Sequence, residues 1–146
     1  MFQLIKIEYG RDNIPEPLLM PATSGIAYTT GMALYLDTAS HTLAIATGDT
    51  HAEYIAMEDK TAKAGDMLLC YQIYPQMLFE ASVSDGTAAD ITVGSRLQFS
   101  ADGKNLSTAI ASGMTVVGGA IKKAAGGMVI RAADTNGRNN SLVVRL

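Results

Sequence analysis

Three ionisable residues, Asp49, His51 and Glu53, alternate along one short stretch of the chain. On a β-strand every second residue points to the same face, so two carboxylates and an imidazole would lie side by side. Such a set of ligands can hold a divalent metal ion. The sequence has one other histidine, His41, and no His-rich segment that could complete a metal site. We therefore favour a polar, solvent-facing strand edge, and we expect neither a metal ion nor another cofactor.

The other residues that could do chemistry stand alone. His41 is expected at an exposed turn, where no neighbouring residue suggests a nucleophile with an orienting partner. Cys70 lies in the apolar run Met67–Tyr74, which favours a buried thiol over a reactive one. Pairs of glycines flank Lys122 and Lys123, but the Gly-Lys-Ser/Thr sequence of a phosphate-binding loop does not follow. The sequence therefore shows no catalytic set, and we expect a protein that is not an enzyme.

The composition is that of a globular domain. A chain of 146 residues buries roughly 68–70% of its unfolded surface, which is enough for a core of its own. Apolar residues make up 48% and charged residues 17%, which excludes a wholly disordered chain, and the single cysteine excludes an internal disulfide. No apolar run reaches the ~20 residues of a membrane-spanning helix, and the start shows no signal-peptide pattern. The net charge of −3 argues against binding nucleic acid with the whole surface.

Short runs of alternating apolar residues between regularly spaced glycines favour strands over helices. We expect strands at Phe2–Glu8, Met32–Leu36, Thr42–Ala46, Glu53–Met57, Met67–Tyr74, Met77–Val83, Arg96–Ser100, Leu106–Ile110, Thr115–Ala120, Met128–Ala132 and Ser141–Leu146. Turns at Asp37–His41 and Ser100–Asn105 indicate two hairpins, and Asp102-Gly103 supplies the positive φ angle of the second. A helix at Ala56–Ala64, ending at Gly65, and a loop there are equally consistent with the sequence.

The two predicted hairpins belong to a partial internal repeat. A shift of 63 residues aligns Gly31–Ala46 with Gly94–Ala109 and keeps the turn at the same length. The matched pairs are Gly31 with Gly94, Leu34 with Leu97, Leu36 with Phe99, Leu43 with Leu106 and Ala46 with Ala109. Coincidence is the alternative, since such a pattern is common in all-β proteins. We favour a repeat, at about 31–73 and 94–132, inside an all-β, barrel-like or sandwich-like domain of short antiparallel strands that spans residues 25–146.

Charge is distributed unevenly along the chain. Residues 1–103 hold 5 basic and 13 acidic side chains, a balance of −8, whereas residues 104–146 hold 6 basic and 1 acidic, a balance of +5. Complementary fields of this kind steer association, although solvated charges without such a role are equally consistent. Residues 104–146 contain no aromatic residue, which disfavours single-stranded nucleic acid as a partner. The candidate electrostatic contacts to other copies or to a partner are Lys122, Lys123, Arg131, Arg138 and Arg145.

Residues 1–24 are expected to form an N-terminal strand followed by a proline-containing arm. Three of the four prolines lie in Arg11–Ser24, and they favour an extended backbone. Consecutive apolar residues on an extended segment are typical of an arm that lies on a partner. A loop folded back over its own core is the alternative. The candidate partner-binding residues are Ile14, Pro15, Pro17, Leu18, Leu19 and Met20.

Several short motifs between Thr23 and Leu146 together resemble one family of proteins. They are the G-x-A-L-Y-L-D-x-x-x-x-x-L run at Gly31–Leu43 and the segments Glu53–Ala56, Gly65–Leu68, Gly94–Phe99 and Ser141–Leu146. In this layout, which also includes a flexible N-terminal segment, the chain resembles the small head decoration proteins, also called capsid cement or auxiliary proteins, of tailed bacteriophages.

The resemblance implies a non-enzymatic structural protein of the virion. Such proteins are made in the host cytoplasm and bind the outside of the assembled icosahedral head, often as trimers, where they clamp neighbouring major capsid subunits. The implied partners are the major capsid protein and further copies of the chain, as a homotrimer, and not nucleic acid, a membrane or a small-molecule substrate. The N-terminal candidates would then contact the capsid. Many weak contacts on a symmetric lattice gain avidity, so no reacting group is needed.

Two other function classes stay open. One is another phage structural module, of a tail, baseplate or head fibre, that contacts a host surface or glycan. The other is a small enzyme of nucleotide or sugar metabolism, built as a β trimer with sites between subunits. Such an enzyme needs acidic and glycine-rich motifs in a fixed order, which the sequence lacks. Exposed aromatic side chains would favour the first class, and a site that gathers Asp49, His51 and Glu53 would favour the second.

Overall fold

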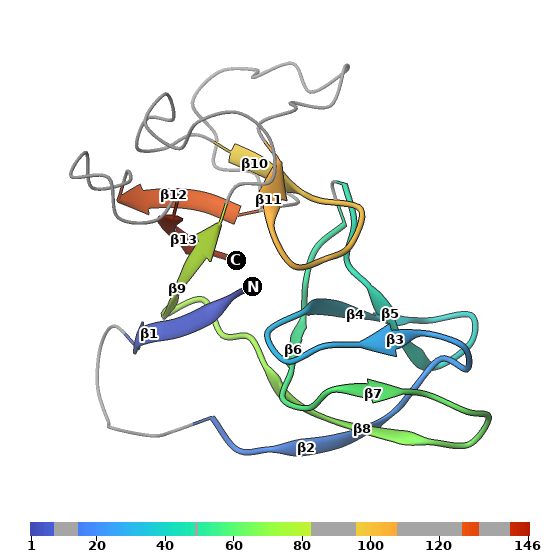
Figure 1. Cartoon of the computed structure of the whole chain (residues 1–146). Coiled ribbons are helices and arrows are strands. Elements are labelled where there is room, and N and C mark those ends of the chain that lie inside the picture. The colour runs from blue at the N-terminus through green and yellow to red at the C-terminus, as the bar shows by residue number, and fades with distance from the viewer. Residues whose placement is uncertain (8–14, 49, 83–95, 108–126, 132–140) are drawn as a thin grey trace.

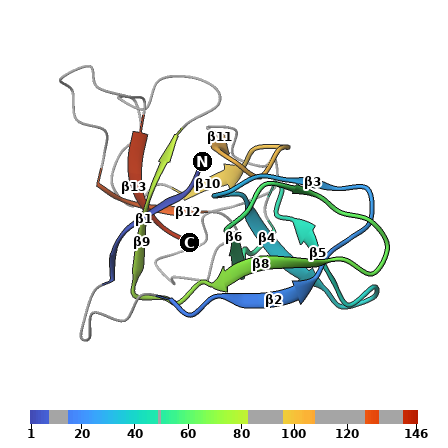
Figure 2. The same ribbon diagram turned by 60° about the horizontal axis from the view of Figure 1, so that its bottom comes forward.

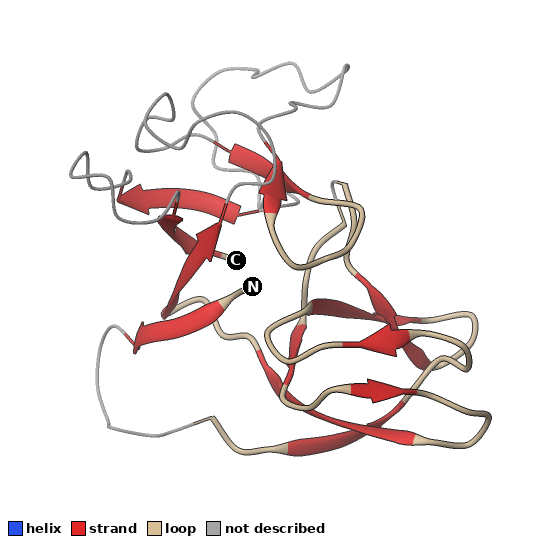
Figure 3. Cartoon of the chain, in the orientation of Figure 1, coloured by secondary structure: helices blue, strands red, loops and turns tan. Residues whose placement is uncertain are grey.

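Short antiparallel strands make up the regular structure of the chain. The computed structural model describes residues 1–7, 15–48, 50–82, 96–107, 127–131 and 141–146. Within these residues there is no helix, and all paired strands run antiparallel (Figure 1, Figure 3). The expected all-β fold is therefore confirmed.

The strands form two larger sheets and one small ribbon. The six-stranded sheet has the order β1 (Gln3–Ile7), β9 (Met77–Ser82), β13 (Ser141–Arg145), β12 (Gly127–Arg131), β10 (Arg96–Phe99) and β11 (Leu106–Ser107). The five-stranded sheet has the order β2 (Leu18–Pro21), β8 (Met67–Gln72), β6 (Tyr54–Ala56), β4 (Ala33–Asp37) and β5 (Thr42–Ile45). The ribbon pairs β3 (Ala27–Tyr28) with β7 (Lys60–Thr61). β1 and β2 are therefore edge strands.

Most of the predicted strands are present, within a few residues at each end. Ten of the eleven are confirmed, and the eleventh, Thr115–Ala120, lies outside the described residues. The segment Ala56–Ala64 is not a helix, because β6 ends and β7 lies within it. Gly65, with φ of +82°, serves the turn into β8 rather than a helix end. Three short strands, β2, β3 and β7, were not predicted from the sequence.

The five-stranded sheet separates two hydrophobic cores, because side chains alternate between the faces of a sheet. In β4, Leu34 points into one core, whereas Ala33 and Tyr35 belong to the other. The inner core packs against the β3–β7 ribbon; its buried members are Ala22, Tyr28, Met32, Leu34, Leu43, Ala56, Ala62, Leu68 and Cys70. The outer core packs against the six-stranded sheet; its buried members are Phe2, Ala33, Ala46, Ala52, Ile55, Met77, Phe79, Ala81, Leu97, Phe99, Leu106 and Val144.

The five-stranded sheet curls so that its two edges approach each other at one end. Ala22, next to β2, forms a single parallel bridge with Leu43 of β5, which does not close the sheet into a barrel. The Leu43 carbonyl accepts hydrogen bonds from the Thr23 hydroxyl at 2.7 Å and from the Tyr28 hydroxyl at 2.6 Å. The Tyr28 hydroxyl in turn accepts one from the Thr23 amide at 2.8 Å. This buried network holds the edges and the ribbon together.

We expect Tyr28→Phe to lower the free energy of unfolding by about 1–2 kcal/mol, because it removes two hydrogen bonds and leaves the Thr23 amide without its acceptor. The measurement is the urea midpoint of the variant against the original protein. Tyr74→Phe is the matched control, because Tyr74 is 44% exposed and its hydroxyl makes only a 3.4 Å contact with Gln72. Equal midpoints for the two variants would contradict a stabilising role of the network.

The second hairpin, β10–β11, joins the two sheets. Its turn places the Gly103 carbonyl 2.8 Å from the Ala33 amide of β4. Gly48 and Phe99 exchange two backbone hydrogen bonds of 3.0 and 2.8 Å. The six-stranded sheet is thereby fixed against the base of the first hairpin, β4–β5.

The two hairpins of the proposed repeat pair in the same register. Leu36 lies opposite Leu43 in the first, and Phe99 lies opposite Leu106 in the second. Each pair is the other shifted by 63 residues. A repeat that extends beyond these hairpins stays a prediction.

Candidate binding surface

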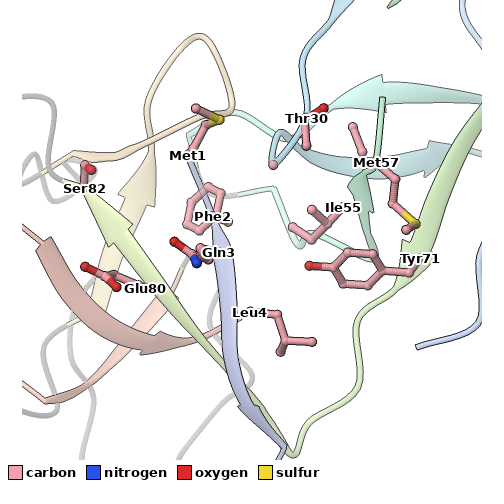
Figure 4. Close-up of a pocket in the computed structure, with 12 residues that line it drawn as sticks. Met1, Phe2, Gln3, Leu4, Thr30, Ile55, Met57, Tyr71, Glu80 and Ser82 are labelled. Carbon is pink, nitrogen blue, oxygen red and sulfur yellow. The ribbon is translucent and has the colours of Figure 1, made fainter. Parts of the chain in front are cut away.

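A cleft of about 600 Å³ opens between β1 and the outer side of the five-stranded sheet. Figure 4 shows β1 running along one side of it, with Ile55 of β6 and Tyr71 of β8 on the other. The cleft is lined by Met1, Phe2, Gln3, Leu4, Thr30, Gly31, Ile55, Ala56, Met57, Tyr71, Glu80 and Ser82. Its volume is in the range of sites that hold a small molecule.

The first residues of the chain are fixed in place and form one wall. Phe2 is buried against Phe99, with ring centroids 5.5 Å apart and an edge-to-face angle of 74°. The Phe2 amide donates to the Gly31 carbonyl at 3.0 Å. The Met1 ammonium donates to the Asn105 side-chain oxygen at 3.3 Å, and burial lowers the pKa of this ammonium. The wall is therefore preformed before any ligand arrives.

Tyr71 brings a hydrogen-bond donor to the cleft. Its ring packs on the outer core beside Ile55, and its hydroxyl points toward β1 (Figure 4). Burial raises the pKa of Tyr71 to about 12, so the hydroxyl keeps its proton at neutral pH. In the part of the chain that the structure describes, the Tyr71 hydroxyl makes no hydrogen bond. This hydroxyl can therefore donate to an acceptor that enters the cleft.

Polar groups lie at the rim of the cleft. Gln3 of β1 faces Glu80 of β9 across the strand pair. The Thr30 amide donates to the Asp59 carboxylate at 2.6 Å, and this bond holds the pKa of Asp59 below its usual value. The rim thus combines amide, hydroxyl and carboxylate groups around an apolar floor.

Four residues on β2 and β8 form a second, continuous surface, which we call the β2/β8 outer face. Leu19 pairs with Leu69, and Pro21 pairs with Met67. Leu19 is 63% exposed and Met67 is 39% exposed, whereas Leu69 is half-buried. Figure 2 shows β2 and β8 side by side, away from β9, β12 and β13. The six-stranded sheet therefore leaves this part of the five-stranded sheet uncovered.

The β2/β8 outer face leads directly into the cleft. Leu69 and Tyr71 are two residues apart on β8, so their side chains share one face of the strand, roughly 7 Å apart along it. Tyr71 lines the cleft. A partner that covers the outer face can thus reach the cleft as well.

The structure divides the predicted partner-binding residues. Leu18 and Met20 pack against the inner core, so of the three consecutive apolar residues only Leu19 stays exposed to a partner. This corrects the expectation that all three lie on a free arm: alternation along β2 turns Leu18 and Met20 to the inner core, where they are half-buried. Pro15 is half-buried and Pro17 is exposed. Ile14 lies outside the described residues.

The predicted basic contacts are mostly beyond the described part of the chain. Lys122, Lys123 and Arg138 lie outside it. Arg131 ends β12, and Arg145 is a half-buried residue at the end of β13. The proposed electrostatic contacts therefore stay a prediction.

Of the alternating ionisable residues, His51 and Glu53 lie outside the strands. His51 is exposed, and Glu53 precedes β6 and accepts a hydrogen bond from the Leu36 amide at 3.0 Å. Asp49 lies outside the described residues. Among those that are described, no group of three His, Cys, Asp or Glu side chains is placed to hold a metal ion. His41 is exposed at the β4–β5 turn, as expected, with φ of 55°.

Cys70 is fully buried in the inner core, as the apolar run around it predicts. Burial raises the pKa of its thiol from 9.0 to about 11. The unfolded chain therefore loses this proton first as the pH rises. The contribution of Cys70 to stability is constant below about pH 9 and decreases between about pH 9 and pH 11.

We expect the free energy of unfolding to fall by about 2 kcal/mol more between about pH 8 and pH 10.5 in the original protein than in Cys70→Ala. The measurement is a urea titration of both proteins at the two pH values. The pH dependence is compared, not the absolute stability, because the substitution also leaves a small cavity. Equal dependence in both proteins would contradict a desolvated thiol at this position.

No helix in the described residues is long and apolar enough to span a membrane. Comparison of the chain with protein-family models, with curated proteins and with solved structures gives no significant match.

Proposed function

We propose that the chain is a structural protein of a bacteriophage particle, which binds the outside of the assembled head and stabilises contacts between major capsid subunits. The resemblance in sequence layout from Thr23 to Leu146 supports this assignment. So does an all-β body in which Leu19, the most exposed large apolar side chain among the described residues, belongs to the N-terminal segment that suggested a partner. No part of this function requires a reacting group.

The observation that carries the proposal is the exposed β2/β8 outer face. Leu19 and Met67 are large apolar side chains on two paired strands, and the neighbouring Leu18 and Leu68 anchor these strands in the inner core. An exposed apolar patch on a rigid element is typical of a protein-binding surface. Because both residues lie on paired strands, their backbone loses little conformational freedom on binding, which favours affinity.

The β2/β8 outer face is small, so tight binding to a capsid would require many copies that bind together. A small apolar face gives a weak contact for a single copy. When copies associate, as in the proposed homotrimer, the second and third contacts form at a high effective concentration, and avidity rises by roughly 10²–10⁴. The acidic balance of residues 1–103 and the basic balance of residues 104–146 would favour head-to-tail association of copies.

The test is a sedimentation assay with expanded, undecorated heads assembled from the major capsid protein encoded in the same genome. The purified chain at micromolar concentration is expected to sediment with the heads, saturably and at a fixed number of copies per capsid subunit. Unexpanded heads and an unrelated β protein of similar size are the controls. No binding to expanded heads at micromolar concentration would overturn the proposal.

A further inference from the structure

The cleft beside β1 lies next to the β2/β8 outer face and is not part of it. Phe2, Leu4 and Ile55 make part of its lining apolar, and the Tyr71 hydroxyl points across it toward β1 (Figure 4). A hydroxyl removed from water without a hydrogen-bond partner costs free energy. Covering the cleft with a purely apolar group would therefore be unfavourable, whereas an apolar group next to an acceptor would suit it.

The adjoining strand edge does not favour the addition of a whole strand. The β1–β9 register shifts between Leu4 and Lys6, which leaves a bulge at Ile5. Bulges and lysine residues at an edge disrupt the regular ladder that an added strand needs. Near the other end of β1, the Phe2 amide is already bonded to the Gly31 carbonyl. A single side chain is thus a better occupant of the cleft than an extended segment.

We infer that the cleft receives one apolar side chain of the capsid protein, and that the Tyr71 hydroxyl donates a hydrogen bond to the peptide carbonyl beside that side chain. The inference rests on the proposed function, because the occupant is the partner that covers the β2/β8 outer face. Continuity of the two surfaces along β8, from Leu69 to Tyr71, places the cleft within reach of that partner. The outer face buries apolar surface area against the partner, and the cleft adds one hydrogen bond.

The probe is N-acetyl-L-leucinamide, which carries one apolar side chain between two amide carbonyls. Titrated into ¹⁵N-labelled protein, it is expected to shift the amide signals of Gln3, Thr30 and Met57 saturably, with a dissociation constant of about 1–10 mM. Tyr71→Phe is expected to weaken binding about three- to tenfold, the worth of one neutral hydrogen bond. Tyr74→Phe, on an exposed tyrosine outside the cleft, is the matched control and should bind like the original protein.

Any one of three results would overturn the inference. The first is that N-acetylglycinamide, which lacks the side chain, gives the same shifts. The second is that Tyr71→Phe binds the leucine probe as the original protein does. The third is that no shift occurs at about 50 mM probe, well above the expected dissociation constant. Because Tyr71 has no internal hydrogen-bond partner among the described residues, the phenylalanine variant should fold normally.

A second measurement links the cleft to the capsid. Tyr71→Phe is expected to weaken the affinity for expanded heads at least three- to tenfold, as it does for the leucine probe. Leu19→Asp should leave the affinity for N-acetyl-L-leucinamide unchanged. If heads do not bind the original protein, the proposed function fails although the amide titration succeeds. If heads bind and Tyr71→Phe has no effect on them, the cleft is not part of the capsid contact.

Discussion

Gly103→Ala is expected to destabilise the protein by about 2–5 kcal/mol, the largest effect on stability that we predict for a single added methyl group. Gly103 has φ of +64°, which costs an alanine roughly 1–2 kcal/mol. A Cβ atom would also meet the Ile45 side chain and lie 3.1 Å from the Ala33 carbonyl oxygen and 3.2 Å from that of Ala46. Relief of these contacts would push the β10–β11 hairpin away from the five-stranded sheet.

Gly65→Ala separates the cost of the positive φ angle from the cost of the steric contacts. Gly65 has φ of +82°, but a Cβ atom there would meet nothing within 4 Å. This variant should therefore show only the backbone cost of roughly 1–2 kcal/mol. The measurement is the urea midpoint of each variant. If Gly103→Ala is no less stable than Gly65→Ala, the second hairpin does not pack tightly on the first.

Leu19→Asp is expected to weaken binding to expanded heads at least about 100-fold and to leave the fold intact. Leu19 is 63% exposed, so its replacement should change the free energy of unfolding by less than about 0.5 kcal/mol. On the capsid, the variant would lose the transfer of an apolar side chain from water, roughly 1.5–3 kcal/mol. It would also bury a carboxylate without a partner, and each 1.4 kcal/mol weakens binding about tenfold.

Ala27→Asp is the matched control for this charge. Ala27 is exposed on β3, in the ribbon on the opposite side of the inner core from the outer face. The control adds the same carboxylate to an exposed strand residue, and we expect it to bind heads like the original protein. Sedimentation with heads measures binding, and circular dichroism checks the fold. Equal binding by Leu19→Asp and Ala27→Asp would contradict the role of the outer face.

The strands could be predicted from the sequence where apolar residues alternate strongly. Leu34 of β4 and Leu43 of β5 are fully buried and both belong to the inner core, on the face that the alternation of large apolar residues predicts. The turn at Asp102-Gly103 was also predicted, and Gly103 indeed has a positive φ. In these segments local preference and tertiary packing agree.

The strands that were not predicted are those whose local sequence favours a different structure, such as a free arm or a helix. Prolines around Leu18 and Met20 suggested a free arm, yet an edge strand tolerates proline because the amide on its open side needs no partner. The ribbon strand β7 lies in the segment that could have been a helix. There the Ala62 amide donates to the Ile26 carbonyl at 2.9 Å, a pairing with a distant segment that local sequence does not encode.

The candidate surface could be predicted only in part for the same reason. Leu19 was identified because it is apolar and lies among prolines, which rarely occur within a central strand. The role of Tyr71 was not predicted, because Met67–Tyr74 is apolar on both faces and resembles a strand buried on both sides. Which face stays open depends on where the six-stranded sheet packs, a property of the tertiary fold.

An image reconstruction of expanded heads decorated with the purified chain tests the central claim most directly. We predict density for the chain on the outer surface of the head, with Leu19 and Met67 facing the major capsid subunits and an apolar capsid side chain beside Tyr71. Density in which the β2/β8 outer face points to solvent, or heads that stay bare at saturating protein, would contradict it.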